Sequence, residues 1–175
     1  LEVRRLPKID FTQAQTNPPW GLDRIDQRDR PGDSLFWREQ SGSGVTVYVF
    51  DTGIRTDHSQ FGGRAVVAWD AVLDGHNGKD CNGHGTHVAG IAGAVGNNGK
   101  GVAGASWHTE MIPVKYACYQ SDSISTSALE RSIDYLVKLG VKVVNCSYGS
   151  DKYTHNWFDR FERDLYDRLL EEGIL

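Results

Sequence analysis

No stretch of this sequence comes near the roughly 18 consecutive apolar residues that a membrane-spanning helix requires, so a membrane is not an expected partner. Residues 1–5 also lack the apolar run of a secretory leader, so either the protein is not exported or a leader lies upstream. The sequence also lacks a large excess of charge of either sign. The net charge is −4 and the basic residues are dispersed, which excludes the usual signature of nucleic-acid binding.

Cysteine is scarce, and three residues cannot all pair within one chain: Cys81, Cys118 and Cys146. Their spacing leaves open one disulfide with a free thiol, or three thiols. What is present is ordinary for a soluble domain, with 39% apolar and 24% charged residues in a length that suits one core. Eight of the 20 glycines lie between residues 83 and 104, and this cluster indicates tight turns and close packing.

The first strong element is a run of β-branched and aromatic residues at 45–50, which follows a Gly/Ser stretch. This pattern predicts a strand buried on both faces, as in a parallel sheet. Residues 64–69 and 111–114 are further predicted strands. Residues 84–95 look helical despite three glycines that each cost about 1 kcal/mol relative to alanine. Such a helix needs a packing reason, and close contact with a sheet would supply one.

The second half alternates more clearly. Ser125 or Thr126 can cap a helix that Gly140 ends, and a predicted strand follows at 141–144. An amphipathic helix then ends at Gly173, and residues 174–175 resemble the opening of another strand. Nearer the N-terminus, residues 17–22 read as a loop anchored by Trp20. The order strand–helix–strand–helix predicts an α/β fold with a mainly parallel sheet.

Two residues carry candidate chemistry. Asp51 ends the first strand, at the edge where α/β sheets place reacting groups, and a carboxylate there needs a partner. A turn or capping role within residues 51–53 explains Asp51 equally well. His84 begins the glycine-rich helix, and a nearby carboxylate would orient its ring as a general base in acyl transfer requires.

Four segments carry a resemblance to a known family. Residues 47–54 (VYVFDTGI) resemble the aspartate motif of subtilases, and residues 82–90 (NGHGTHVAG) resemble their histidine motif. Residues 143–149 (VVNCSYG) resemble the strand that lines the substrate cleft, and 16–25 (TNPPWGLDRI) the mature start of the proteinase K-like branch. Aspartate also precedes histidine, as in subtilisin. The sequence is thus similar to the subtilisin-like serine proteases, peptidase family S8, from about Gln13 onward.

The resemblance implies a three-layer α/β sandwich around a mainly parallel sheet. Asp51 would orient His84, and His84 would be the base of an Asp-His-Ser triad in a serine endopeptidase. The substrate would be a polypeptide bound in extended conformation. Its cleft would be lined on one side by Ser147, Tyr148 and Gly149, and on the other by Ser123 within residues 121–125.

Two family motifs do not occur in these residues: Gly-Thr-Ser-x-Ala-x-Pro, which holds the nucleophile, and the Ala-Gly-Asn segment of the oxyanion hole. We therefore expect residues 15–175 to be the N-terminal part of a catalytic domain, incomplete at the C-terminus and inactive by itself. The alternative is an inert subtilase-like fragment or a binding module. Residues 1–14 resemble the tail of a propeptide, which would act as the protein's own inhibitor, or form an N-terminal arm. The resemblance therefore implies a secreted, monomeric protein that is made as a zymogen and needs no cofactor for catalysis.

Accessory features also follow from the resemblance. Residues 94–102 (AVGNNGKGV) resemble a calcium loop in which Asn98 would be a ligand. Gln60 stands where such relatives have a liganding aspartate, so we expect a plain turn more than a structural calcium site. Cys81 and Cys118 occupy places that resemble a disulfide of some proteinase K-like enzymes, which would imply an oxidising compartment. Cys146 is expected to be a buried small residue inside a strand.

Two other site types fit these residues less well. The segment Phe50-Asp51-Thr52-Gly53 is close to the aspartic-protease signature, but that family needs two copies on a largely β fold. A zinc site at His84 and His87 lacks a third ligand and a glutamate between the two. His87 is expected to be a buried structural histidine instead.

Overall fold

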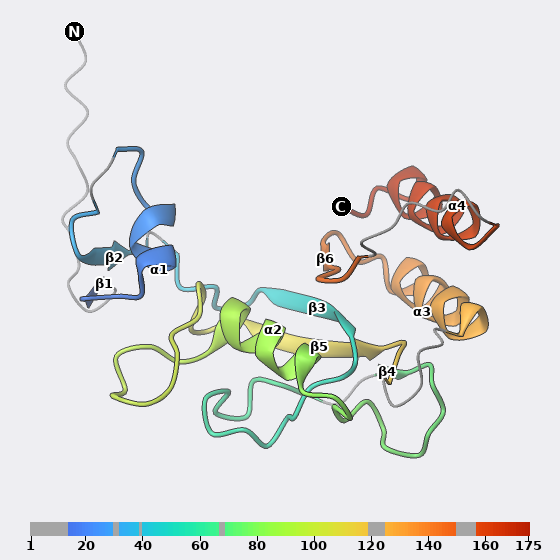
Figure 1. Cartoon of the computed structure of the whole chain (residues 1–175), viewed down its shortest axis with the longest axis horizontal. Coiled ribbons are helices and arrows are strands. Elements are labelled where there is room, and N and C mark those ends of the chain that lie inside the picture. Colours follow the sequence, from blue (N-terminus) through green and yellow to red (C-terminus); the bar gives the residue numbers. More distant parts are fainter. Residues whose placement is uncertain (1–13, 30–31, 39, 67–68, 119–124, 150–156) are drawn as a thin grey trace, which may run out of the picture.

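The structure is a computed structural model that describes residues 14–29, 32–38, 40–66, 69–118, 125–149 and 157–175 (Figure 1). No helix in these ranges is long and apolar enough to cross a membrane. The elements in chain order are β1 (Ala14–Thr16), α1 (Trp20–Ile25), β2 (Leu35–Trp37), β3 (Thr46–Asp51), β4 (Trp69–Asp70), α2 (His84–Gly93), β5 (Glu110–Lys115), α3 (Thr126–Leu139), β6 (Val144–Asn145) and α4 (Trp157–Glu171).

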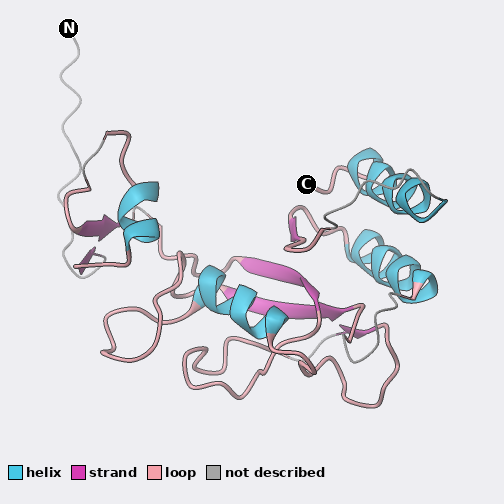
Figure 2. Ribbon diagram, viewed as in Figure 1, coloured by secondary structure: helices cyan, strands magenta, loops and turns pink. Residues whose placement is uncertain are grey.

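The main sheet has the order β4-β5-β3-β6, and every neighbouring pair is parallel (Figure 2). β3 and β5 pair along their whole length, from Thr46 opposite Glu110 to Asp51 opposite Lys115. The predicted α/β fold with a parallel sheet is therefore confirmed. Because all four strands run the same way, their carboxyl ends meet at one edge of the sheet.

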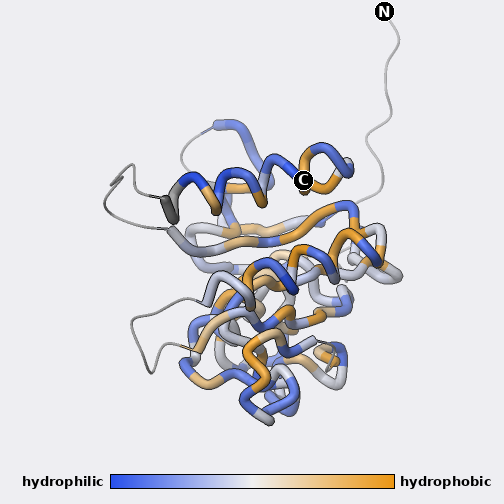
Figure 3. The backbone as a smooth tube through the Cα atoms, turned by 90° about the vertical axis from the view of Figure 1, so that its right-hand side faces the viewer, coloured by the Kyte–Doolittle hydropathy of each residue, from blue (hydrophilic) through white to orange (hydrophobic). Residues whose placement is uncertain are grey.

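The sheet separates two hydrophobic cores, which gives three layers. Val49 packs on one side with residues of α2, and Phe50 packs on the other with residues of α3 and α4. Strand alternation explains this division, since successive side chains point to opposite faces. The prediction that β3 is buried on both faces holds only for its last three residues, and residues 46–48 are half-buried. Figure 3 shows hydrophilic and hydrophobic stretches alternating along the two long helices, as one-sided packing requires.

The predicted caps of α3 are present. The Ser125 hydroxyl accepts a hydrogen bond from the backbone N–H of Ala128 at 3.4 Å, so Ser125 is the N-cap. Gly140 has φ 63° and ends the helix in the left-handed conformation. On the opposite face, α2 carries the three glycines of the predicted close contact. Gly93 meets that expectation, because a Cβ there would lie 2.7 Å from Met111 Sδ.

Several strands are shorter than predicted. Of residues 64–66, Ala65 forms only an isolated bridge to Met111, and β4 consists of two residues. β6 is also two residues long. Beside it, Leu175 donates to the Lys142 carbonyl at 2.9 Å and accepts from Val144 N at 2.8 Å, which is the spacing of a parallel ladder.

The N-terminal segment forms its own small unit. β1 and β2 pair antiparallel, and Asn97 Nδ2 donates to the Ala14 carbonyl at 2.9 Å. Trp20 begins α1 and its side chain is 84% exposed, so the prediction of a loop anchored by this ring is wrong. The remainder of the predicted arm, residues 1–13, lies outside the described residues.

Candidate active site

Asp51 is the last residue of β3, and only 2% of it is exposed. Strand alternation turns it to the face of Val49, which α2 covers. Its Oδ1 accepts a hydrogen bond from the backbone N–H of Thr52 at 2.7 Å. The strand thus delivers a buried carboxylate to the carboxyl edge of the sheet, beneath the start of α2.

His84 is the first residue of α2 and contacts this carboxylate. Its Nδ1 lies 2.8 Å from Asp51 Oδ1 and 3.0 Å from Oδ2, while 42% of the His84 side chain is exposed. A carboxylate only accepts hydrogen bonds, so Nδ1 carries the proton that this contact shares, and Nε2 is the nitrogen that has the lone pair whenever the ring is neutral. Among the residues that the structure describes, no hydrogen bond engages Nε2. The ring is therefore held from the buried side and is able to accept a proton on the open side.

Glycine makes this approach possible. A Cβ on Gly85 would lie 2.1 Å from the Gly53 carbonyl oxygen and 3.2 Å from Asp51 Cβ. Gly53 itself has φ +105°, and a Cβ there would lie 2.5 Å from the Gly78 carbonyl oxygen. The first turn of α2 therefore rests directly on the backbone that follows β3.

The carboxylate of Asp80 lies between these two segments. Its Oδ1 accepts from Thr52 Oγ1 at 2.8 Å and from the backbone N–H groups of Asn82 and Gly83 at 3.0 and 2.9 Å. Its Oδ2 accepts from Thr86 N at 2.9 Å and from the Thr86 hydroxyl. Burial alone would raise the pKa of Asp80, but these hydrogen bonds hold it below its ordinary value.

A buried cation braces the segment before His84. Lys115 is fully buried at the end of β5, and its Nζ donates to Asp74 Oδ2 at 2.5 Å and to the Lys79 carbonyl at 2.9 Å. Burial raises the pKa of the Asp74 carboxyl. Hydrogen bonds from Lys115 and from the His76 N–H outweigh this and leave that pKa below its ordinary value.

A disulfide joins Cys81 to Cys118, with the two Cα atoms 5.8 Å apart, and ties the same segment to the chain after β5. Asp74 lies close to both sulfurs. Sulfurs bonded to one another do not serve as thiolate ligands, so this cluster is not a metal site.

The predicted cleft residues follow β6 at the same sheet edge, because Val49 of β3 lies opposite Asn145. Ser147 and Gly149 are exposed. The ring of Tyr148 packs against Phe50 and Tyr116 at centroid distances of 5.8 and 4.9 Å. The Tyr148 ring, which is predicted to line the cleft, therefore has one face packed against the core. Ser123, predicted for the opposite side of the cleft, lies outside the described residues.

Two local predictions differ from the structure. Cys146 is half-buried and lies just beyond β6, and burial raises its thiol pKa to about 11. His87 is exposed, so the prediction of a buried histidine is wrong. The reason is helical phase: Gly85, Val88 and Ala89 turn toward the sheet, and position 87 turns away.

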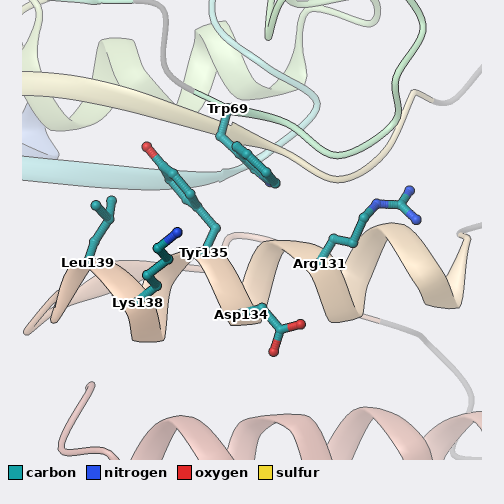
Figure 4. Close-up of a pocket in the computed structure, with 6 residues that line it drawn as sticks. All are labelled: Trp69, Arg131, Asp134, Tyr135, Lys138 and Leu139. Atoms are coloured by element: carbon teal, nitrogen blue, oxygen red, sulfur yellow. The ribbon is translucent and has the colours of Figure 1, made fainter.

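A groove of about 420 Å³ lies on the other face of the sheet, between α3 and the edge strand β4 (Figure 4). The rings of Trp69 and Tyr135 stack in it with centroids 4.5 Å apart. Asp51 and His84 lie on the α2 face, so this groove is separate from their site. Its lining residues are Trp69, Arg131, Asp134, Tyr135, Lys138 and Leu139.

Comparison with known proteins identifies a family whose sequence pattern matches the residues of this site. The model of the peptidase S8 subtilase family matches residues 42–168, which include Asp51, His84 and the strands β3 to β6.

The chain belongs to the subtilase family.

Named relatives agree with this assignment. This subtilase chain is 40% identical over 146 residues to alkaline serine exoprotease A of Vibrio alginolyticus, covering 82% of this chain and 26% of that protein. It is 38% identical over 165 residues to the extracellular serine proteinase of Thermus sp. (strain Rt41A), covering 87% of this chain and 38% of that protein. The chain thus spans between a quarter and two-fifths of the length of these relatives.

Solved structures give the same result for the fold. The crystal structure of a cold-adapted subtilisin-like serine proteinase superposes with a TM-score of 0.74 at 34% sequence identity. The match covers 91% of this chain and 54% of that one. The fold expected of subtilases is therefore present across the described residues.

The residues of the subtilase loop 94–102 do not fit a calcium ion. Asn98 Oδ1, the expected ligand, accepts from Lys100 N at 3.0 Å, and Asn98 Nδ2 donates to Gln60 Oε1 at 2.8 Å. Gln60 Nε2 in turn donates to the Lys100 carbonyl at 2.6 Å. Calcium takes carboxylate and carbonyl oxygens, but Asn98 Oδ1 and Gln60 Oε1 each already accept a hydrogen bond within the loop, and position 60 brings no carboxylate.

Two parts of the site were not found from the sequence: Asp80 and the Lys115–Asp74 pair. Both lie in or contact the Gly/Asn/Asp-rich stretch 74–83, which reads only as a loop. One signal was available for Asp80, since an aspartate shortly before a helix start is a common source of caps.

Proposed function

We propose that the protein to which these residues belong is a serine endopeptidase, with Asp51 and His84 as two members of its triad. The observation that carries this proposal is the contact of His84 Nδ1 with the buried Asp51 carboxylate at 2.8 and 3.0 Å, while Nε2 remains on the open side. The family match supports it, because the matched residues include both side chains.

In the proposed reaction, His84 Nε2 takes the proton of a serine hydroxyl as its oxygen attacks the scissile carbonyl carbon. Asp51 holds the tautomer through Nδ1–H and stabilises the imidazolium that forms. The imidazolium then gives its proton to the leaving amine as the C–N bond breaks and the acyl-enzyme remains. Water repeats the sequence, releasing the acid product and regenerating the serine.

The proposed substrate is a polypeptide in extended conformation, bound beside Ser147, Tyr148 and Gly149 and, on the other side, near Ser123. Support comes from the position of residues 147–149 at the carboxyl edge that carries Asp51. The proposed setting is extracellular, as a monomer inhibited by its own propeptide, with residues 1–14 as the tail of that propeptide. The disulfide suits an oxidising compartment, and one relative is named an extracellular proteinase.

No cofactor enters the proposed reaction, and residues 1–175 contain no serine within the family's nucleophile motif. We therefore expect these residues alone to be inactive. Purified residues 1–175 that hydrolyse casein above background, with contamination excluded, would contradict this expectation.

A fluorophosphonate probe tests the proposal on the protein as its host makes it, because only a complete triad makes a serine react quickly. We expect labelling of the wild type and its loss in His84→Ala. Asp51→Asn should lower kcat by a factor on the order of 10⁴. The exposed His108 is a matched control, and His108→Ala should label like the wild type. A well-folded protein that does not label would favour the inert binding module.

A further inference from the structure

A hydrogen-bond relay runs from the turn after β3 into α2, and Asp80 sets its direction. The Thr52 hydroxyl donates to Asp80 Oδ1 at 2.8 Å and accepts from the Gly85 N–H at 3.0 Å. Because a carboxylate only accepts, the Thr52 proton points to Asp80 and the oxygen lone pair is left for Gly85. Both Thr52 and Gly85 are buried, so water does not compete for these bonds.

A second relay runs the other way through Thr86. Its hydroxyl donates to Asp80 Oδ2 and accepts from the Arg55 N–H at 2.9 Å. The segment after β3 thus accepts a hydrogen bond from a backbone N–H of α2, and α2 accepts one from a backbone N–H of that segment. Both exchanges depend on one carboxylate.

The same carboxylate caps α2. The N-cap residue is Gly83, which has φ 100° and no side chain to offer. Asp80 accepts from the N–H groups of Gly83 and Thr86 instead, and its negative charge lies at the positive end of the helix. Asp80 therefore fixes the start of α2, where the His84 ring is attached.

We propose that Asp80 is a positioning residue, which holds the first turn of α2 at the distance that lets His84 Nδ1 reach Asp51. This role rests on the proposed function of that pair. Asp80 acts through Thr52 and Thr86, and in the part of the chain that the structure describes no hydrogen bond joins it to the His84 ring.

Asparagine at position 80 would disturb this arrangement in either orientation of its amide. Oδ1 of Asp80 accepts three hydrogen bonds and Oδ2 accepts two. An NH₂ group in either place therefore faces at least two donors. The threonine hydroxyl that faces the NH₂ group must then rotate its hydrogen away from position 80. The backbone amide whose hydrogen bond this hydroxyl accepted, Gly85 for Thr52 or Arg55 for Thr86, loses its partner.

The first measurement is native-state amide hydrogen exchange on residues 1–175, which requires no activity. In Asp80→Asn we expect protection of one of the two relayed amides to fall at least about tenfold beyond any global change: Gly85 if the NH₂ group faces Thr52, or Arg55 if it faces Thr86. Neither amide touches Asp80, so the change would report the relay. Asp134→Asn removes the same charge from the ion pair that joins α3 to Arg168 of α4, and it should leave both amides unchanged.

Thr86→Val is the second variant, in case Asp80→Asn fails to fold. It removes the hydroxyl and keeps the shape, so the Arg55 amide should lose its protection. Thr86→Ser retains the hydroxyl and should restore it. Unchanged protection of the Arg55 amide in Thr86→Val would overturn the proposal.

The second measurement is kcat and KM of the active protein, corrected by active-site titration with the fluorophosphonate probe. A displacement of 1 Å costs on the order of 10²-fold in rate, so Asp80→Asn should lower kcat per titrated site at least about tenfold with little change in KM. An unchanged kcat per site would overturn the positioning role. A wild type that does not label would count against the proposed function, and hydrogen exchange would then decide the role of Asp80.

Discussion

Replacing Gly85 by alanine should push apart the two backbone segments that bring Asp51 and His84 together. The added Cβ would lie 2.1 Å from the Gly53 carbonyl oxygen, while ordinary van der Waals contact begins at 3.4 Å. The first turn of α2 must therefore move by more than about 1 Å or deform. Overpacking of this kind costs about 1–3 kcal/mol of unfolding free energy, and a 1 Å misplacement costs on the order of 10²-fold in rate.

Gly90→Ala is the matched control, because it lies in the same helix. The nearest atom to a Cβ there is Val102 Cγ2 at 3.9 Å, which is ordinary contact. Alanine is the better helix former by about 0.8–1 kcal/mol, so this variant should be more stable than the wild type. Urea unfolding of residues 1–175 followed by circular dichroism measures both changes. Gly85→Ala as stable as the wild type would refute the close contact that we describe.

Three further predictions concern the braces around the site. Replacing Cys81 and Cys118 by alanine should lower the unfolding free energy by about 4 kcal/mol, from the loop entropy of a 37-residue separation; a loss below about 1 kcal/mol in urea would contradict this. Asp74→Asn should lower the unfolding free energy by about 3 kcal/mol, because it leaves Lys115 buried without its anion. This is the low end of the range for a buried pair, since the Asp74 side chain is 22% exposed. The folded pKa of Asp74 is depressed, so its contribution is present above about pH 4 and disappears as pH falls through the folded value; a variant deficit that does not shrink in acid would argue against it. Calcium should leave the wild-type Tm unchanged and raise the Tm of Gln60→Asp, and a wild-type Tm that rises with calcium over EDTA would oppose the amide-closed loop.

The sequence was sufficient for the features that depend on local pattern. The run ending at Asp51 and the helix starting at His84 are visible in periodicity and composition, and the strand–helix alternation predicts a parallel sheet. Ser125 and Gly140 were identifiable as caps because capping is decided by a few adjacent residues.

Features that depend on tertiary partners were not available in the same way. The lengths of β4 and β6 are set by where β5 and β3 offer hydrogen-bond partners, which composition does not record. The inward turn of Asp80 depends on two hydroxyls brought in from other segments. The exposure of His87, in contrast, was within reach, since the glycines of α2 already mark the side that meets the sheet.

The pairing of β3 with β5 has a consequence for how the chain acquires its site during synthesis. Thr46 and Glu110 are partners across 64 positions, and α2 lies within the intervening segment. Closing so long a loop costs entropy before any contact is gained, and distant pairings are slow. The β3–β5 pair on which α2 packs is therefore complete only after Lys115 has been added to the chain, about 3 to 13 seconds after Asp51 at ordinary elongation rates of about 5–20 residues per second. Until then the nascent chain carries both side chains without the full sheet surface that seats α2.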